Sequence, residues 1–148
     1  MLLRSFAALA LFCCATAAAQ SMNEAPPHVV APGKLASYWT MINASIEADA
    51  PNYGKNIQQP GCVTVSFVVE KDGNTSTAKV QRVVPAGDLA KVALSEVVSL
   101  HFEATAFNAG KQRVFSWLIF PFNLPKDPAA RTAVMQKCLI DPLDWKDR

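Results

Sequence analysis

Residues 61–84 read GCVTVSFVVEKDGNTSTAKVQRVV, and this stretch decides the fold. Valine or phenylalanine occupies every odd position from 63 to 69, which is the period-two pattern of a strand with one buried face. The dipeptide Asp72-Gly73 favours a two-residue hairpin turn, because glycine accepts a positive φ angle at little cost. Residues 75–84 then resume the alternation. The pattern therefore predicts a β-hairpin.

A helix and a further strand are predicted after the hairpin. Pro85 and Gly87 interrupt the second strand, and Asp88 is a suitable N-cap for a helix. Apolar residues then recur at helical spacing, at Leu89, Val92, Ala93, Val97 and Leu100. Residues 113–122, RVFSWLIFPF, form a strongly β-prone run. We expect an α+β fold: a small three-stranded antiparallel sheet with helices packed on one face.

The order hairpin, helix, strand resembles the C-terminal domain of TonB, the periplasmic energy transducer. The residues that carry the resemblance are GCVTVSFVVEKDGN, VPAGDLAKVALSEVV, HFEA, AGKQRV and FPF, within Ala50 to Leu124. The resemblance implies a stand-alone TonB-like protein whose last strand captures an extended segment of an outer-membrane receptor. Such capture is strand addition, in which main-chain hydrogen bonds give affinity and alternate side chains give specificity. It also implies a link to transmembrane transport.

The N-terminus has the composition of a secretory signal peptide. Arg4 precedes the apolar run FAALALFCC, and Ala17-Ala18-Ala19 is a small-residue exit, so we expect cleavage after Ala19 and a periplasmic protein. A retained membrane anchor is disfavoured because the run is shorter than the ~20 residues that span a bilayer. A lipoprotein is disfavoured because bulky Phe12 lies close before Cys14. The cleaved chain is expected to have no membrane span.

The remaining chain divides into three parts. Residues 20–34 are a Pro-rich arm, residues 35–124 are the TonB-like domain with an N-terminal helix, and residues 125–148 are a C-terminal tail with a short helix. The first helix is predicted over Gly33 to Asp49 from the spacing of its apolar residues, which are Leu35, Tyr38, Trp39, Ile42 and Ile46. The tail helix is predicted over Ala129 to Leu139.

Charge and cysteine content exclude several classes of function. The net charge of +2 becomes +1 once Arg4 is removed, and no basic stripe is present, so we expect no nucleic-acid partner. Cys62 and Cys138 remain after export into an oxidising compartment and most simply form one disulfide. A redox or metal site is the alternative, but neither a Cys-x-x-Cys spacing nor a set of four ligands is present. No metal and no cofactor are expected.

The sequence gives no positive sign of an enzyme. The serines at 66, 95 and 116 lie in predicted regular structure without a Gly-x-Ser-x-Gly elbow. No paired carboxylates and no phosphate-binding glycine loop are present either. We therefore expect a binding or structural protein.

The candidate partner-binding residues lie on one face of the last strand, at Arg113, Phe115, Trp117 and Ile119. In one hypothesis, the edge of this strand is open and binds an envelope protein or receptor peptide. In the other, the chain is a structural or accessory envelope protein whose own tail or first helix covers the strand. The sequence leaves open whether the protein is a monomer or a dimer.

Overall fold

The computed structural model describes residues 24–43 and 48–141 of the 148-residue chain. The expected signal peptide lies outside the described residues, as do Ile46, the start of the arm and the end of the tail. Within the described ranges, no helix is both long enough and apolar enough to cross a membrane.

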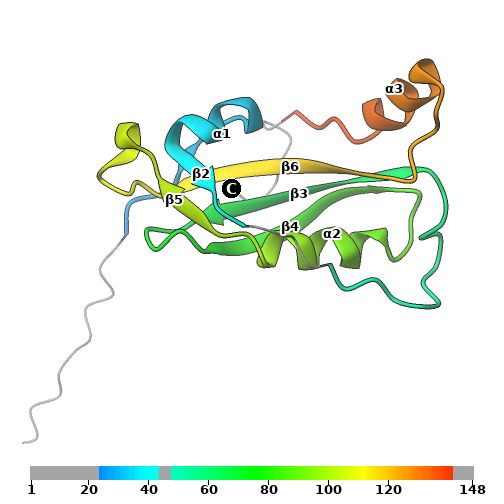
Figure 1. The fold of residues 1–148 in the computed structure, drawn as a ribbon, viewed down its shortest axis with the longest axis horizontal. Coiled ribbons are helices and arrows are strands. Elements are labelled where there is room, and N and C mark those ends of the chain that lie inside the picture. The colour runs from blue at the N-terminus through cyan, green and yellow to red at the C-terminus, as the bar shows by residue number, and fades with distance from the viewer. Residues whose placement is uncertain (1–23, 44–47, 142–148) are drawn as a thin grey trace, which may run out of the picture.

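The centre of the molecule is a four-stranded sheet (Figure 1). Its strands, in spatial order, are β1 (His28–Val29), β6 (Val114–Phe122), β3 (Gly61–Val69) and β4 (Thr75–Val84). β3 pairs antiparallel with both β4 and β6, whereas β1 pairs parallel with β6. The fold is α+β, but the prediction of three antiparallel strands is wrong. The arm adds a fourth strand because His28 and Val29 pair with the free edge of β6.

The predicted helix over Gly33 to Asp49 is shorter than expected. α1 covers Pro32–Tyr38, and the chain then becomes extended as β2 (Trp39–Met41). β2 pairs antiparallel with β5 (Phe102–Ala104), which forms a separate two-stranded sheet. The β-prone run Trp39-Thr40-Met41 thus gains ladder hydrogen bonds that outweigh its helical spacing.

The hairpin and the following helix agree with the sequence pattern. Gly73 has a φ of +85° in the turn, although the loop spans residues 70–74 and not two residues. α2 (Leu89–Val98) packs beneath β3 and β4 with Leu89, Ala93 and Val97 fully buried. Asp88 does not cap this helix through its side chain. Its carboxylate instead accepts a hydrogen bond from the Lys55 amide at 2.7 Å, which ties the preceding loop to the start of α2.

The core lies between α2 and the face of the sheet that carries the odd-numbered residues of β3. This core face receives Leu35 of α1, Trp39 of β2 and Phe102 of β5, which all belong to one buried cluster. The short 3-10 helix η1 (Ala106–Asn108) connects β5 to the loop before β6. Residues of α1, β2, β5 and α2 therefore join one cluster with the odd-numbered residues of β3.

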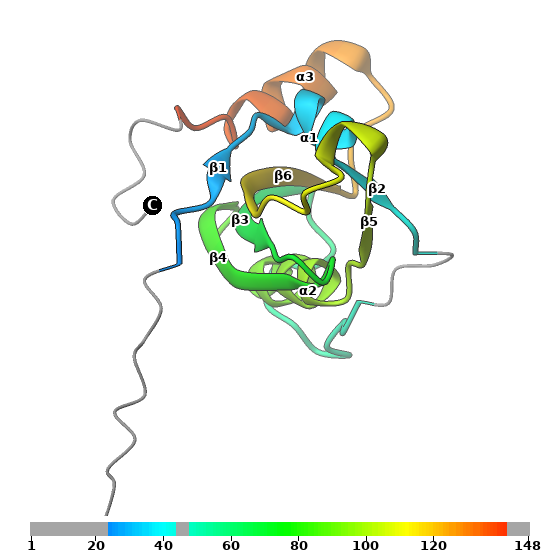
Figure 2. The same cartoon turned by 90° about the vertical axis from the view of Figure 1, so that its left-hand side faces the viewer.

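The opposite face of the sheet, which we call the tail face, is also covered. α3 (Pro128–Gln136) and the segment after it lie on this side, so α2 and α3 flank the sheet from opposite directions (Figure 2). All nine residues of β3 are buried as a result. The prediction that the helices pack on one face only is wrong, because α3 and the tail cover the second face.

Candidate partner-binding edge

The outer edge of β6 is defined by residue parity. The carbonyls of Arg113 and Phe115 accept hydrogen bonds from the amides of His28 and Val30, both at 2.9 Å. Since successive residues of a strand direct their backbone groups to opposite sides, Ile119 and Pro121 share this outward direction. Pro121 agrees with this outward direction, because a proline has no N–H and here loses no hydrogen bond to β3. The even-numbered residues of β6 serve the ladder with β3.

β1 covers only the first part of this edge. Its residues pair with Val114 and Phe115, after which the chain turns into α1. The Ser116 hydroxyl donates to the Val30 carbonyl at 2.9 Å, which marks the place where the arm leaves β6. Within residues 24–43 and 48–141, no strand pairs with Ile119 to Phe122 on this side. We call this stretch, residues 119–122, the open edge.

The four candidate residues are split by this geometry. Arg113 and Phe115 lie beside β1, and Phe115 is buried. Trp117 and Ile119 lie farther along β6 and are half-buried. The side chains of Phe115, Trp117 and Ile119 share the tail face with Val68, Ser66 and Thr64, which lie opposite them on β3. The sequence analysis did not predict β1, although the β-prone residues of His28-Val29-Val30 are a local signal of a short strand.

Arg113 holds together the end of the sheet where the arm docks. Its guanidinium donates two hydrogen bonds to the Glu70 carboxylate, with Nη2 to Oε1 at 2.9 Å and Nε to Oε2 at 2.5 Å. The Ser76 hydroxyl also donates to Glu70. Glu24 of the arm pairs with Arg113 at 3.4 Å and with Lys71 at 2.8 Å. Arg113 is therefore paired with Glu70 at the start of the hairpin loop and with Glu24 of the arm.

Hydrogen bonding shifts the titration of these carboxylates. The bonds from Arg113 hold the pKa of Glu70 below its usual value of 4.5, against the opposing effect of burial. The hydrogen bond from Lys71 lowers the pKa of Glu24 in the same way, although Glu24 is exposed. Glu70 is the better enclosed of the two, so the effect on stability should be clearest there.

Folding stability is expected to fall in acid partly through Glu70. A carboxylate whose folded pKa is lowered contributes stability that is fully present above its unfolded pKa, here near 4.5, and is lost as the pH falls through the folded value. Glu70→Gln should therefore be less stable than the native chain at neutral pH, and the two should converge below pH 4.5. Urea unfolding across this range measures the difference. A stability difference between Glu70→Gln and the native chain that stays constant with pH would contradict the assignment.

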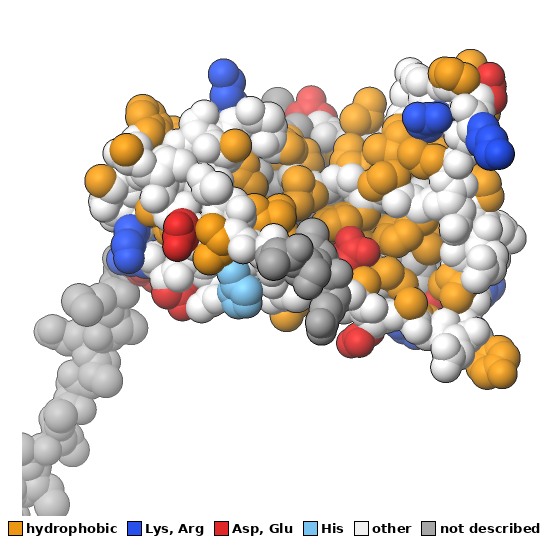
Figure 3. Space-filling model, viewed as in Figure 1, with side chains coloured by type: hydrophobic (Ala, Val, Ile, Leu, Met, Phe, Trp, Pro, Cys, Tyr) orange, Lys and Arg blue, Asp and Glu red, His pale blue; other side chains and the backbone are white. Residues whose placement is uncertain are grey.

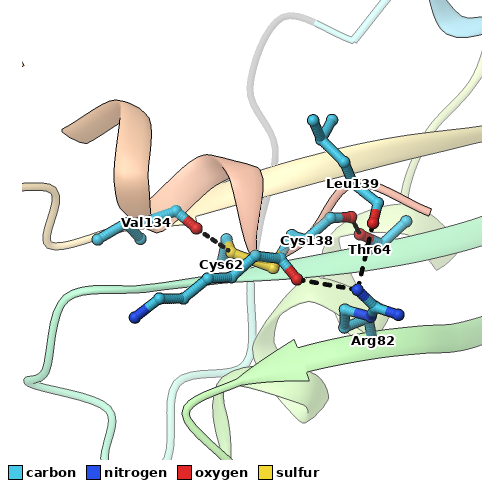
Figure 4. Close-up of a disulfide and its surroundings, with 7 residues drawn as sticks. Cys62, Thr64, Arg82, Val134, Cys138 and Leu139 are labelled. Carbon is cyan, nitrogen blue, oxygen red and sulfur yellow. Dashed lines mark hydrogen bonds between the residues drawn. A yellow bond between two sulfur atoms is a disulfide. The ribbon is translucent and has the colours of Figure 1, made fainter. Parts of the chain in front are cut away.

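The predicted disulfide between Cys62 and Cys138 is present and lies on the tail face (Figure 4). Both cysteines are fully buried. The Thr64 hydroxyl donates to the Cys138 carbonyl at 2.6 Å, and the Arg82 guanidinium donates to the carbonyls of Lys137 and Leu139, both at 3.2 Å. The tail therefore crosses β3 and β4 over the face of the sheet. In the part of the tail that the structure describes, it forms no strand beside β6.

A partly exposed apolar surface borders the open edge on the core face. Leu118, Phe120 and Phe122 of β6 are half-buried and pack against the core cluster, as Ile57 and Leu94 also do. α1, β2 and β5 cover only one half of this face, and hydrophobic side chains gather at the surface over the other half, between α2 and α3 (Figure 3). A strand added to the open edge would place alternate side chains beside this surface.

No arrangement for metal chemistry is found among the described residues. No group of three or more histidine, cysteine, aspartate or glutamate side chains in these ranges is placed to hold a metal ion. Glu96 is the one described carboxyl whose pKa is raised, and the cause is burial in α2.

Comparison with known proteins finds a similarity at the level of the fold. No protein-family model matches the chain, and no curated protein matches it. The fold is similar to the solution structure of the Pseudomonas aeruginosa TonB C-terminal domain. The TM-score is 0.41 at 21% sequence identity, and the match covers 62% of this chain and 91% of that one. This similarity concerns the fold alone.

Proposed function

We propose that this protein is an exported periplasmic binding module that recognises an extended segment of an outer-membrane receptor or another envelope protein by strand addition. The observation that carries the proposal is the open edge. Ile119 directs its N–H and C=O away from β3, and so does the carbonyl of Pro121. In the described chain no hydrogen bond to these groups is found. In this proposal, binding of the envelope protein supports transmembrane transport.

The size of the open edge limits the guest. β1 blocks Val114 and Phe115, so a guest pairs with Ile119 to Phe122 while the arm stays in place. Only a few main-chain hydrogen bonds are then available, each worth roughly 0.5–1.5 kcal/mol net. Additional affinity must come from guest side chains that lie beside Leu118 and Phe120. The guest we expect is therefore a short segment with alternating apolar side chains.

One sequence feature and one structural feature support a periplasmic location. The first 19 residues have the pattern of a signal peptide. The Cys62–Cys138 disulfide fits an oxidising compartment, because disulfides persist there and are rare in the cytosol. The resemblance of the hairpin, helix and last strand to the TonB C-terminal domain supports an envelope partner.

A structural or accessory role is the second candidate, and one observation favours it. β1 pairs with the first part of the outer edge of β6, and the disulfide-linked tail covers one face of the same sheet. The chain thus already covers part of the β6 edge with its own residues. This candidate predicts no specific peptide binding at the open edge.

Proline at position 119 is expected to weaken guest binding about tenfold. Ile119→Pro removes the outward N–H and adds a ring where the guest backbone would lie, and loss of one hydrogen bond corresponds to roughly tenfold in Kd. The ladder with β3 should survive, because the neighbouring Pro121 already has the same parity. Binding of synthetic peptides from the plug segments of outer-membrane receptors is measured by fluorescence anisotropy and by amide chemical shifts.

Stability and an alternative edge provide the controls. The thermal unfolding midpoint of Ile119→Pro should stay close to that of the native chain, which separates lost binding from lost folding. Val29→Pro places the same substitution on β1 and should leave binding to the open edge unchanged. Failure of all plug peptides to bind the native chain overturns the proposed function, and binding that Ile119→Pro does not weaken moves the site elsewhere.

A further inference from the structure

The arm that covers β6 has an outer edge of its own. His28 and Val30 direct their amides to β6, so Val29 directs its N–H and C=O away from the sheet. Within the described ranges no hydrogen bond to the Val29 backbone is found, and the side chain is 44% exposed. β1 is therefore the terminal strand of the sheet at this end, and the free backbone groups of Val29 are available to another strand.

Two pockets flank this outer edge, one on each face of the sheet. On the core side a pocket of about 340 Å³ is bordered by His28, Tyr38 and Phe107. On the tail side a pocket of about 400 Å³ is bordered by Pro26, Pro27, Val29 and Phe115. A strand alternates its side chains between the two faces, so one added strand would reach both pockets with neighbouring residues.

The core-side pocket is suited to an aromatic or bulky apolar side chain. The Tyr38 and Phe107 rings meet edge to face with their centroids 5.1 Å apart, and the His28 and Tyr38 rings lie 5.5 Å apart. Phe107 is 74% exposed, which leaves most of its ring available for contact. Aromatic pairs in such geometries gain stability beyond that from the area that they bury.

The same pocket also has a positive charge without an internal partner. Lys34 of α1 lines the pocket and is exposed, and no described acidic residue forms an ion pair with its ammonium group. In contrast, Lys71 and Arg113 on the other side of the arm are both paired with Glu24. A guest with a carboxylate beside its aromatic side chain would complement Lys34.

We propose that the outer edge of β1, with its two flanking pockets, is a second docking site, for an extended acidic-aromatic peptide segment. The guest pairs with Val29, places a bulky side chain beside Tyr38 and Phe107 and a carboxylate near Lys34, and directs the next residue to the pocket at Pro27 and Phe115. The site is separate from the open edge of β6 and does not depend on guest binding there.

The length of β1 favours a peptide over a second copy of the protein. The strand has two residues, whereas a stable protein interface buries on the order of 800 Å² on each partner. A peptide needs only local contacts: the backbone of Val29 and one pocket on each side. A dimer formed through Val29 is the competing outcome.

The test uses the native chain and the peptide Thr-Asp-Val-Phe-Val-Asp-Thr, whose aspartates lie on the same face as phenylalanine in either strand direction. Amide chemical shifts should change at Val29, Lys34 and Phe107, and not at Ile119. Val29→Pro should weaken binding about tenfold through the lost hydrogen bond. Lys34→Gln, and the same peptide with asparagines, should each weaken binding severalfold and reduce its salt dependence.

Three results would overturn the proposal. The first is a lack of binding at about 1 mM peptide, since a Kd of this size corresponds to a binding free energy near −4 kcal/mol. The second is binding that Val29→Pro leaves unchanged, and the third is a concentration-dependent dimer, seen by sedimentation, that Val29→Pro converts to monomer. Ile119→Pro is the matched control and should bind this peptide as the native chain does. Loss of plug-peptide binding with retention of this peptide would reject the proposed function alone, and the reverse would reject this site alone.

Discussion

Replacement of both Cys62 and Cys138 by alanine is expected to lower the free energy of unfolding by about 2–5 kcal/mol. The disulfide joins residues 76 positions apart and so restricts a long loop of the unfolded chain. Both side chains are fully buried, and the pair holds the tail against β3. Urea unfolding of the oxidised native chain and of the double variant measures the difference.

The reduced native chain is the matched control for this prediction. With reductant present, the native chain should unfold near the urea concentration at which the double variant unfolds, because both then lack the cross-link. Hydrogen exchange should rise at the tail, where the contacts from Thr64 and Arg82 are worth only about 0.5–1.5 kcal/mol each. Equal midpoints for the oxidised native chain and the double variant would contradict a stabilising role.

The sequence predicts the elements whose signals are local. The alternation in residues 61–84, the apolar spacing after Asp88 and the run at 113–122 each identify an element without knowledge of its neighbours. The structure places β3, β4, α2 and β6 there. The disulfide could also be predicted from the sequence, because two cysteines in an exported chain leave one simple pairing.

The elements that the sequence did not predict depend on distant partners. β1 has two residues and exists because β6 offers an edge to pair with. Trp39 to Met41 have helical spacing with α1, yet β5, some sixty residues later, draws them into a sheet. Tertiary pairing of this kind overrides local propensity. The same non-local pairing decides which part of the β6 edge is covered.

The candidate binding residues show the same division. The alternation in 113–122 correctly groups Phe115, Trp117 and Ile119 on one face. It contains no information on the arm, so it could not separate the part of β6 beside β1 from the open edge. Strand alternation alone places Arg113 in this group, whereas its carboxylate partners Glu70 and Glu24 come from the hairpin and the arm.

Trp39→Ala is expected to destabilise the fold by about 3–5 kcal/mol, as is usual for loss of a large buried aromatic side chain. Trp39 is 2% exposed and belongs to the main core cluster, although its strand β2 lies in the separate small sheet. Its indole Nε1 also donates to the Gln112 carbonyl at 3.1 Å, just before β6. Thermal and urea unfolding measure the loss.

Two further variants decide what this residue does. Trp39→Phe keeps most of the buried ring and removes the hydrogen bond to Gln112, so it should cost about 1–2 kcal/mol. Tyr53→Ala removes a fully exposed aromatic ring and should change stability by less than about 0.5 kcal/mol. If Trp39→Ala lowered stability as little as Tyr53→Ala, the β2–β5 sheet would contribute little to the stability of the core. A large loss would instead show that this small sheet folds with the core and fixes α1, and with it the arm, beside β6.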